Sequence, residues 1–173
     1  MTLRLLAISG SLRAGSSNTM LLKAACALAP PGIVVELYDG LGALPHFNPD
    51  LDVEPRPAAV ADLHARIKAA DGLVICSPEY ARGVAGAMKN ALDWMVSDED
   101  FAGKKVALFN ASPRATHALA ALRLTLETMA ARVIDDAALT LPLLGAPASV
   151  EGIVGDPALA HSVRTALAAM ARS

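Results

Sequence analysis

Short apolar runs alternate along the chain with segments in which apolar residues recur at helical spacing. The apolar runs lack a sustained alternation with polar residues, which is typical of strands in a parallel sheet covered on both faces. We expect five strands, within Leu3–Ile8, Ile33–Tyr38, Gly72–Cys76, Lys104–Asn110 and Val133–Leu141. We expect helices over Thr19–Ala29, Pro57–Ala70, Val84–Val96, Thr116–Ala131 and from Asp156 onward. Leu44–Leu51 and Leu143–Val154 contain turn formers and predict a loop and an irregular connection.

This alternation predicts a single α/β domain over residues 1–173. Five β–α units joined by right-handed crossovers form an open, doubly wound parallel sheet with helices on both faces, and we favour the strand order 2-1-3-4-5. In that order the topological switch lies between the first and third strands. The loops that start at Gly10 and Ser77 should therefore flank one crevice, where a ligand is expected to bind.

The loop after the first strand has the composition of an anion site. Gly10 and Gly15 permit close backbone approaches. Hydroxyl, amide and guanidinium groups surround the start of the following helix, from Ser11, Arg13, Ser16, Ser17 and Asn18. The free N–H groups and dipole of a helix N-terminus attract anions, and an arginine fork suits phosphate. The loop therefore predicts a phosphate site, with a turn that only caps the helix as the alternative.

Two familiar phosphate loops do not match this stretch. The dinucleotide fingerprint G-x-G-x-x-G is absent, because the next glycine after Gly10 is Gly15. That spacing matches a P-loop, but Ser16-Ser17 replaces the Lys-[Ser/Thr] pair that reaches the terminal phosphates. Nucleoside triphosphate hydrolysis is therefore disfavoured, and the loop suits one terminal phosphate.

Three segments together carry a resemblance to a known family. They are Gly10-Ser11-Leu12-Arg13-x-Gly15-Ser16-x-Asn18, Pro78-Glu79-Tyr80 and Lys89-Asn90-Ala91-Leu92-Asp93-Trp94. The stretch from about Leu3 to Leu144 resembles the NAD(P)H-dependent FMN reductases of the flavodoxin-like superfamily, which include quinone and chromate reductases. This resemblance implies a flavodoxin-like fold, FMN held by its phosphate in the first loop, and a homodimer or homotetramer.

The resemblance also implies the surroundings of the flavin ring. The ring would lie against Pro78, Glu79, Tyr80, Ala81 and Gly83, with Ser112 on a third side. Flavin N5 accepts a hydride from NADPH or NADH and passes electrons to a small acceptor such as free flavin or a quinone, so no catalytic side chain is required. The chain departs from the family pattern at three places. Asparagine is common at Ala81 and proline at Ala85, and Arg114–Ala118 lacks the usual glycines.

The composition limits which binding partners and which cellular compartment we expect. The net charge is −2, basic residues are dispersed and aromatic residues make up 3%, so a nucleic-acid partner is not expected. Hydrophobic residues make up 54%, which fits a sheet buried on both faces together with an oligomer interface. Because no apolar run has the length of a membrane span and the chain start lacks a signal-peptide pattern, we expect a cytoplasmic protein without a membrane partner.

A few reactive residues have ordinary explanations. Cys26 and Cys76 lie in apolar elements, so we expect two buried thiols and no disulfide. His46 has no carboxylate or cysteine at a ligand spacing, so we expect an exposed loop histidine and no metal centre. Lys89 and Asp93 are four residues apart on a helix and should form an ion pair.

Three other functions would require sequence features that differ from those present. A flavodoxin-like electron carrier that does not oxidise NAD(P)H is the main alternative, although such carriers have strongly acidic surfaces and this chain is near neutral. A response-regulator receiver would need acidic residues where Ser9-Gly10 and Cys76-Ser77 stand. A serine hydrolase would need a G-x-S-x-G elbow, which the sequence lacks.

Overall fold

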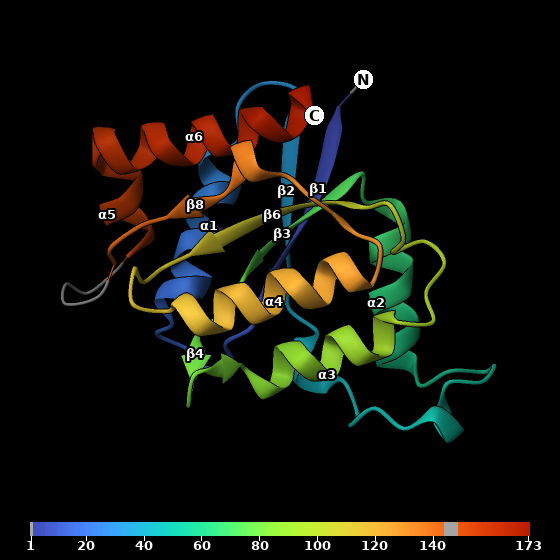
Figure 1. The fold of residues 1–173 in the computed structure, drawn as a ribbon. Helices are drawn as coiled ribbons and strands as arrows, with labels where there is room; N and C mark the ends of the chain where they lie inside the picture. Colours follow the sequence, from blue (N-terminus) through green and yellow to red (C-terminus); the bar gives the residue numbers. More distant parts are fainter. Residues whose placement is uncertain (1, 144–148) are drawn as a thin grey trace.

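The computed structural model describes residues 2–143 and 149–173, which form a parallel sheet between two layers of helices (Figure 1). The strands are β1 Leu3–Ser9, β2 Ile33–Tyr38, β3 Gly72–Cys76, β4 Glu79–Tyr80, β5 Gly83–Val84, β6 Lys105–Asn110, β7 Arg132–Val133 and β8 Leu139–Thr140. The α-helices are α1 Ser17–Leu28, α2 Ala58–Ala69, α3 Gly86–Met95, α4 Thr116–Thr128, α5 Val150–Gly155 and α6 Pro157–Arg172. The predicted α/β class is therefore confirmed.

The main sheet has the order β2-β1-β3-β6-β7, and β8 also pairs with β6. Every pairing in it is parallel, with Ile8 opposite both Tyr38 and Ile75. This is the predicted order 2-1-3-4-5, with β3 and β6 as the third and fourth strands. The topological switch therefore lies between β1 and β3 as expected.

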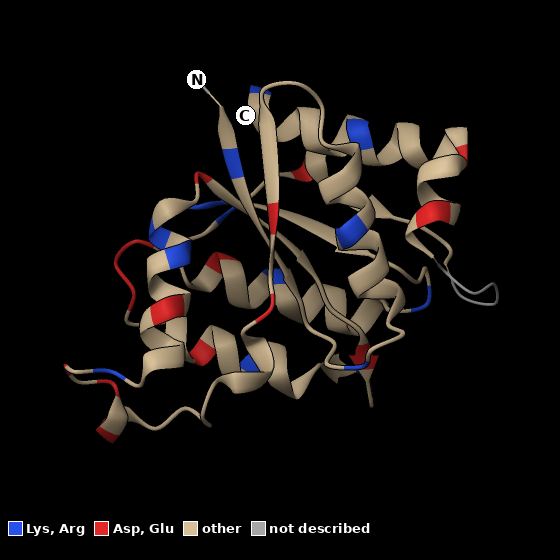
Figure 2. Ribbon diagram, turned by 180° about the vertical axis from the view of Figure 1, so that it is seen from behind, with Lys and Arg blue, Asp and Glu red and all other residues tan. Residues whose placement is uncertain are grey.

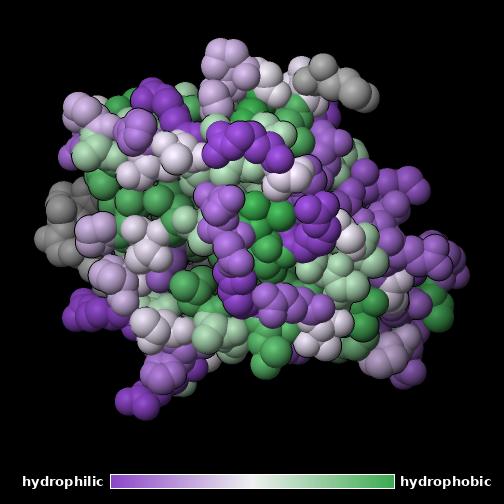
Figure 3. All heavy atoms as spheres, turned by 45° about the horizontal axis from the view of Figure 1, so that its top comes forward, coloured by the Kyte–Doolittle hydropathy of each residue, from purple (hydrophilic) through white to green (hydrophobic). Residues whose placement is uncertain are grey.

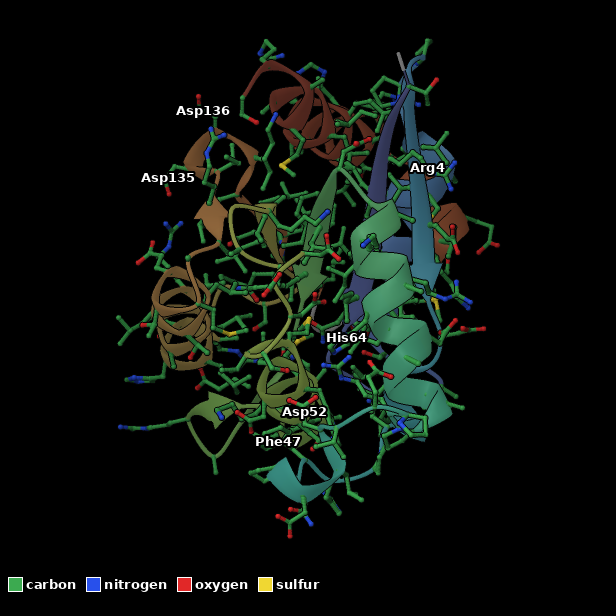
Figure 4. All side chains as sticks on the ribbon, turned by 90° about the vertical axis from the view of Figure 1, so that its right-hand side faces the viewer. Arg4, Phe47, Asp52, His64, Asp135 and Asp136 are labelled. Carbon is green, nitrogen blue, oxygen red and sulfur yellow. The ribbon has the colours of Figure 1, made fainter. Side chains whose placement is uncertain are left out.

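The fifth strand is not continuous, so the prediction of a single strand within Val133–Leu141 is wrong. Two short strands, β7 and β8, occupy this position, and a 3₁₀ turn over Asp135–Ala137 separates them. Asp135 and Asp136 interrupt the apolar run, and aspartate is unfavourable in a strand. Figure 4 shows both aspartates on the outside of the fold, and Asp135 pairs with Arg123 of α4 at 2.7 Å.

Each face of the sheet has its own apolar core, which explains why the strands show no polar alternation. Leu5 and Ala7 of β1 point into a core that α1, α5 and α6 cover. Leu6 and Ile8 point into the opposite core, which α2, α3 and α4 cover. Because successive strand residues face opposite sides, both sets must be apolar when both faces are covered.

The helix predictions are confirmed in position, with differences at their ends. The short helix α5 lies in the predicted connection Leu143–Val154, of which residues 144–148 are outside the described part of the chain. A 3₁₀ turn over Pro49–Leu51 likewise lies in the predicted loop. The last helix begins as expected, because the Asp156 carboxylate accepts hydrogen bonds from the N–H groups of Ala158 and Leu159.

Charged residues of both signs are spread over the surface, and the helices α2, α3 and α4 each carry both signs (Figure 2). Hydrophobic residues on the face drawn in Figure 3 lie in small groups between hydrophilic ones. Within residues 2–143 and 149–173, no helix combines the length and the apolar character needed to cross a membrane.

Candidate functional site

The loops that follow β1 and β3 meet at the carboxyl edge of the sheet. The N–H of Gly10 donates a hydrogen bond to the carbonyl of Cys76 at 2.9 Å. A Cβ on Gly10 would lie 2.3 Å from Ser77 Oγ and 2.8 Å from Ser77 Cβ. Only glycine therefore allows these two loops to approach so closely.

The first loop is folded back on itself by short hydrogen bonds. Ser9 Oγ accepts from the Ser11 N–H and lies 2.8 Å from Thr19 Oγ1, while Ser11 Oγ accepts from the Arg13 N–H. The carbonyl of Arg13 accepts from the Ser16 N–H at 3.2 Å. These bonds fix the loop backbone, while the Arg13 side chain remains exposed to solvent.

The N-terminus of α1 is available to an anion. Ser16 is the N-cap residue and is buried, yet its side chain makes no capping hydrogen bond. The first N–H groups of a helix have no partner within the helix, and the dipole makes this end positive. The sequence left open the alternative that the turn only caps the helix. The Ser16 side chain does not cap it.

The second loop contains a small hairpin that we did not predict from the sequence. Strands β4 and β5 pair antiparallel, with Glu79 opposite Val84 and Tyr80 opposite Gly83. Ala81 and Arg82 form the tip with φ values of 49° and 60°. A two-residue turn with both φ values positive favours asparagine and glycine, and Ala81-Arg82 gives no such signal.

The three departures from the family pattern are accommodated by the backbone. Ala81 adopts the left-handed conformation that asparagine tolerates better, at a cost of about 1 kcal/mol or more. Ala85 has φ of −55°, an angle that proline also adopts. Arg114–Ala118 contains no residue with positive φ among those described, so glycine is not required there.

The Glu79 carboxylate joins the second loop to α4. Its Oε2 accepts a hydrogen bond from the N–H of Ala118, in the first turn of α4, at 2.9 Å. The N-cap residue of α4, Ala115, has no side chain that could do this. Glu79 therefore caps a helix that is 39 residues away in the sequence.

The loop after β6 forms the third wall. Asn110 is 3% exposed, and its Oδ1 accepts from the Ser112 N–H at 3.1 Å. Ser112 Oγ in turn accepts from the Arg114 N–H at 3.2 Å. The backbone of this loop is thus held by its own side chains, as in the loop after β1.

These three loops enclose a cavity of about 360 Å³, a size typical of small-molecule sites. Nine of the eleven predicted site residues line it: Ser11, Arg13, Ser16, Ser17, Asn18, Pro78, Glu79, Tyr80 and Ser112. The predicted residues Ala81, at the hairpin tip, and Gly83, in β5, are not among the lining residues. Five further lining residues were missed: Ser77, Asn110, Ala111, Arg114 and Ala115.

A simple signal could have identified the missed residues. Ser77 follows directly after β3, and Asn110 to Ala115 are the last residue of β6 and the loop after it, where parallel strands present their carboxyl ends to a ligand. A Ser-Pro pair lies just beyond each of these strands, at Ser77-Pro78 and Ser112-Pro113, yet only Ser112 was predicted as a site residue on the third side.

The cavity contains no activated nucleophile among the described residues that line it. The neighbouring Cys76 is fully buried, and burial raises the pKa of its thiol well above the usual range. The thiol therefore stays protonated and donates to Asn18 Oδ1 at 3.1 Å. This bond fixes the Asn18 amide at the start of α1.

Cys26 is also a free thiol, but it is only partly buried, so the expectation of burial is wrong for it.

The segment Lys89–Trp94 positions a loop and does not line the cavity. The carbonyl of Pro45 accepts from Asn90 Nδ2 at 3.0 Å and from Trp94 Nε1 at 2.8 Å. Phe47, labelled in Figure 4, donates its N–H to Asn90 Oδ1, and its ring packs edge-on against the ring of Trp94. Lys89 pairs with Asp93 as predicted.

Comparison with known proteins agrees with this geometry. Residues 3–143 match the family model of NADPH-dependent FMN reductases. An NAD(P)H-dependent FMN reductase of Pseudomonas aeruginosa is 41% identical over 112 residues, 64% of this chain and 60% of the relative. A quinone reductase of Escherichia coli K12 is 36% identical over 113 residues, again 64% of this chain and 60% of the relative. The matched region thus spans less than two thirds of each relative.

A solved structure matches over almost its whole length. FerB of Paracoccus denitrificans, described as a flavoenzyme NAD(P)H:(acceptor) oxidoreductase, superposes with a TM-score of 0.79 at 27% identity. The superposition covers 99% of this chain and 98% of FerB.

Proposed function

The chain belongs to the family of NADPH-dependent FMN reductases, and we propose that it is an FMN-dependent oxidoreductase that oxidises NADH or NADPH. The electrons would pass to free flavin, a quinone or a similar small acceptor, as the names of its relatives suggest. The observation that carries this proposal is the uncapped α1 N-terminus with Arg13, facing a cavity walled by Pro78, Glu79 and Tyr80.

The residues of the cavity fit FMN. One terminal phosphate would accept hydrogen bonds from the free N–H groups of α1 and from Arg13, and the hydroxyls of Ser16 and Ser17 lie at the same end. When bound, FMN supplies hydride acceptance at its ring and electron transfer to the acceptor. Glu79 would hold the second wall in place through α4, since its carboxylate is already committed to Ala118. It is therefore not proposed as a proton donor.

The rim leaves room for two substrates in turn. Tyr80 is 58% exposed, so one side of the cavity is open to solvent. A dinucleotide could bind there, leave, and be replaced by the acceptor. The near-neutral net charge of −2 also argues against a flavodoxin-like carrier, which would use a strongly acidic surface for docking.

We expect FMN-loaded protein to oxidise NADH or NADPH through many turnovers when a soluble quinone is supplied. The physical reason is the open side of the cavity beside Tyr80. Steady-state loss of dinucleotide absorbance measures this. Protein that binds FMN but is reduced by neither dinucleotide would instead be an electron carrier, and protein that neither shows flavin absorption nor quenches added FMN fluorescence would have no flavin site.

We also propose a homodimer or homotetramer, supported by exposed apolar residues beside the end of α3. Leu51, Val53 and Val96 are 43%, 60% and 67% exposed. Asp52, between Leu51 and Val53, interacts with Ser97, the neighbour of Val96, so the two segments are adjacent: hydrogen bonds from Arg56 and then Ser97 lower the pKa of the Asp52 carboxyl below its usual range. Such a patch is a typical interface core.

Val96→Asp is expected to weaken self-association at least about tenfold, because an unpaired carboxylate would be buried in the interface. Light scattering across a concentration series measures the change. Leu124→Asp is the matched control, since Leu124 is also 67% exposed but lies on α4. A wild-type monomer at micromolar concentration, or equal effects of both substitutions, would contradict this interface.

A further inference from the structure

Two arginines line the cavity from opposite walls. Arg13 belongs to the loop after β1 and Arg114 to the loop after β6. Strand β3 lies between β1 and β6, so the two loops start roughly 10 Å apart at the usual strand spacing. The proposed FMN phosphate lies at the N-terminus of α1, on the Arg13 side. One phosphate therefore accounts for Arg13 and leaves Arg114 without an assigned role.

The charge of Arg114 is not neutralised within the described part of the chain. No carboxylate of residues 2–143 or 149–173 forms an ion pair with Arg114. Glu79, the acidic residue among the described residues that line the cavity, accepts a hydrogen bond from the N–H of Ala118 instead. An uncompensated guanidinium at the mouth of a cavity attracts anionic ligands.

The backbone of Arg114 is held in place. Its N–H donates to Ser112 Oγ at 3.2 Å, and the N–H of the buried Ala115 donates to the Ser112 carbonyl at 3.1 Å. The side chain itself is exposed. A fixed backbone with a solvent-facing guanidinium suits a ligand that arrives and leaves, because little of the loop must be reordered on binding.

We propose that Arg114 binds the diphosphate of the nicotinamide dinucleotide, a role that rests on the proposed function above. If the flavin ring binds against the second and third walls, hydride transfer would require the nicotinamide to stack on it there. The diphosphate is separated from the nicotinamide by one ribose, whereas the 2′-phosphate of NADPH is at the far, adenosine end. The diphosphate is thus the anion within reach of the third wall. Because NADH and NADPH share it, Arg114 should serve both equally.

The test is Arg114→Gln in FMN-loaded protein. The KM values for NADH and for NADPH are each expected to rise by about ten- to a hundred-fold, because the variant loses one charge-assisted hydrogen bond or a pair of such bonds. The rate at saturating dinucleotide and the dissociation constant of FMN should stay within about twofold of wild type. Arg164→Gln on the exposed face of α6 removes the same charge and should change none of these values.

Other results would overturn the assignment. An unchanged KM would remove Arg114 from dinucleotide binding, and a rise for NADPH alone would assign it to the 2′-phosphate. Weaker FMN binding would place it on the flavin. A second readout is independent of turnover: the dissociation constant of NAD⁺ for the FMN-loaded protein, measured by equilibrium dialysis. If wild type binds NAD⁺ through Arg114 but never oxidises NADH, the proposed function fails and this inference stands. If Arg114→Gln leaves NAD⁺ binding unchanged, the inference fails whatever the activity.

Discussion

Arg13→Ala is expected to weaken FMN binding by about ten- to a hundred-fold and to leave riboflavin binding nearly unchanged. FMN and riboflavin differ only in the phosphate, and a charge-assisted hydrogen bond to that group contributes about 1.5–3 kcal/mol. Arg13 lines the cavity at the N-terminus of α1, where the Ser16 side chain makes no capping bond. The ratio of the two dissociation constants, from fluorescence quenching titrations, should therefore fall toward unity.

The comparison of two ligands provides its own control for folding. A substitution that merely disturbed the loop would weaken both ligands alike. Equal weakening of FMN and riboflavin by Arg13→Ala would mean that Arg13 supports the fold or contacts the ring, and the phosphate assignment of this loop would be withdrawn.

Gly10→Ala is expected to destabilise the protein by about 1–3 kcal/mol, the usual cost of overpacking a well-packed site. The new methyl group would lie 2.8 Å from Ser77 Cβ and 3.1 Å from Met88 Cβ, and neither atom can rotate away. The loops after β1 and β3 would have to separate, which should also weaken FMN binding. The free energy of unfolding from urea titration measures the first effect.

Gly15→Ala is the matched control in the same loop. A Cβ on Gly15 would meet nothing within 4 Å, so the unfolding free energy should be unchanged within about 0.5 kcal/mol. The double variant Gly10→Ala/Ser77→Gly removes both the Ser77 Oγ and its Cβ, and it should recover part of the lost stability. A Gly10→Ala protein as stable as Gly15→Ala would show that the two loops need not approach as closely as described here.

The strand order and the position of the crevice could be predicted because they depend on burial. The run Leu5–Ile8 is apolar at every position, which only a strand covered on both faces requires, and the core residues on either side confirm it. Once β1 and β3 are placed side by side, their carboxyl ends define the crevice without further information.

Features that depend on single contacts could not be predicted. The Glu79 cap on α4 joins residues 39 apart, and neither local sequence indicates the other. The hairpin tip uses Ala81-Arg82 in a conformation that their sequence disfavours, so tertiary contacts override local preference there. The segment Lys89–Trp94 helped to identify the family, but its contacts with Pro45 and Phe47 give it a structural role.

The most direct test of flavin reduction in this crevice is an anaerobic titration of FMN-loaded protein with NADPH and, separately, NADH. No acceptor is present, so only the bound flavin can take the hydride. We predict that the visible flavin absorption bleaches with at least one of the two dinucleotides and returns when a quinone is added. Flavin that stays oxidised with both would contradict the assignment of this crevice as a site of dinucleotide oxidation.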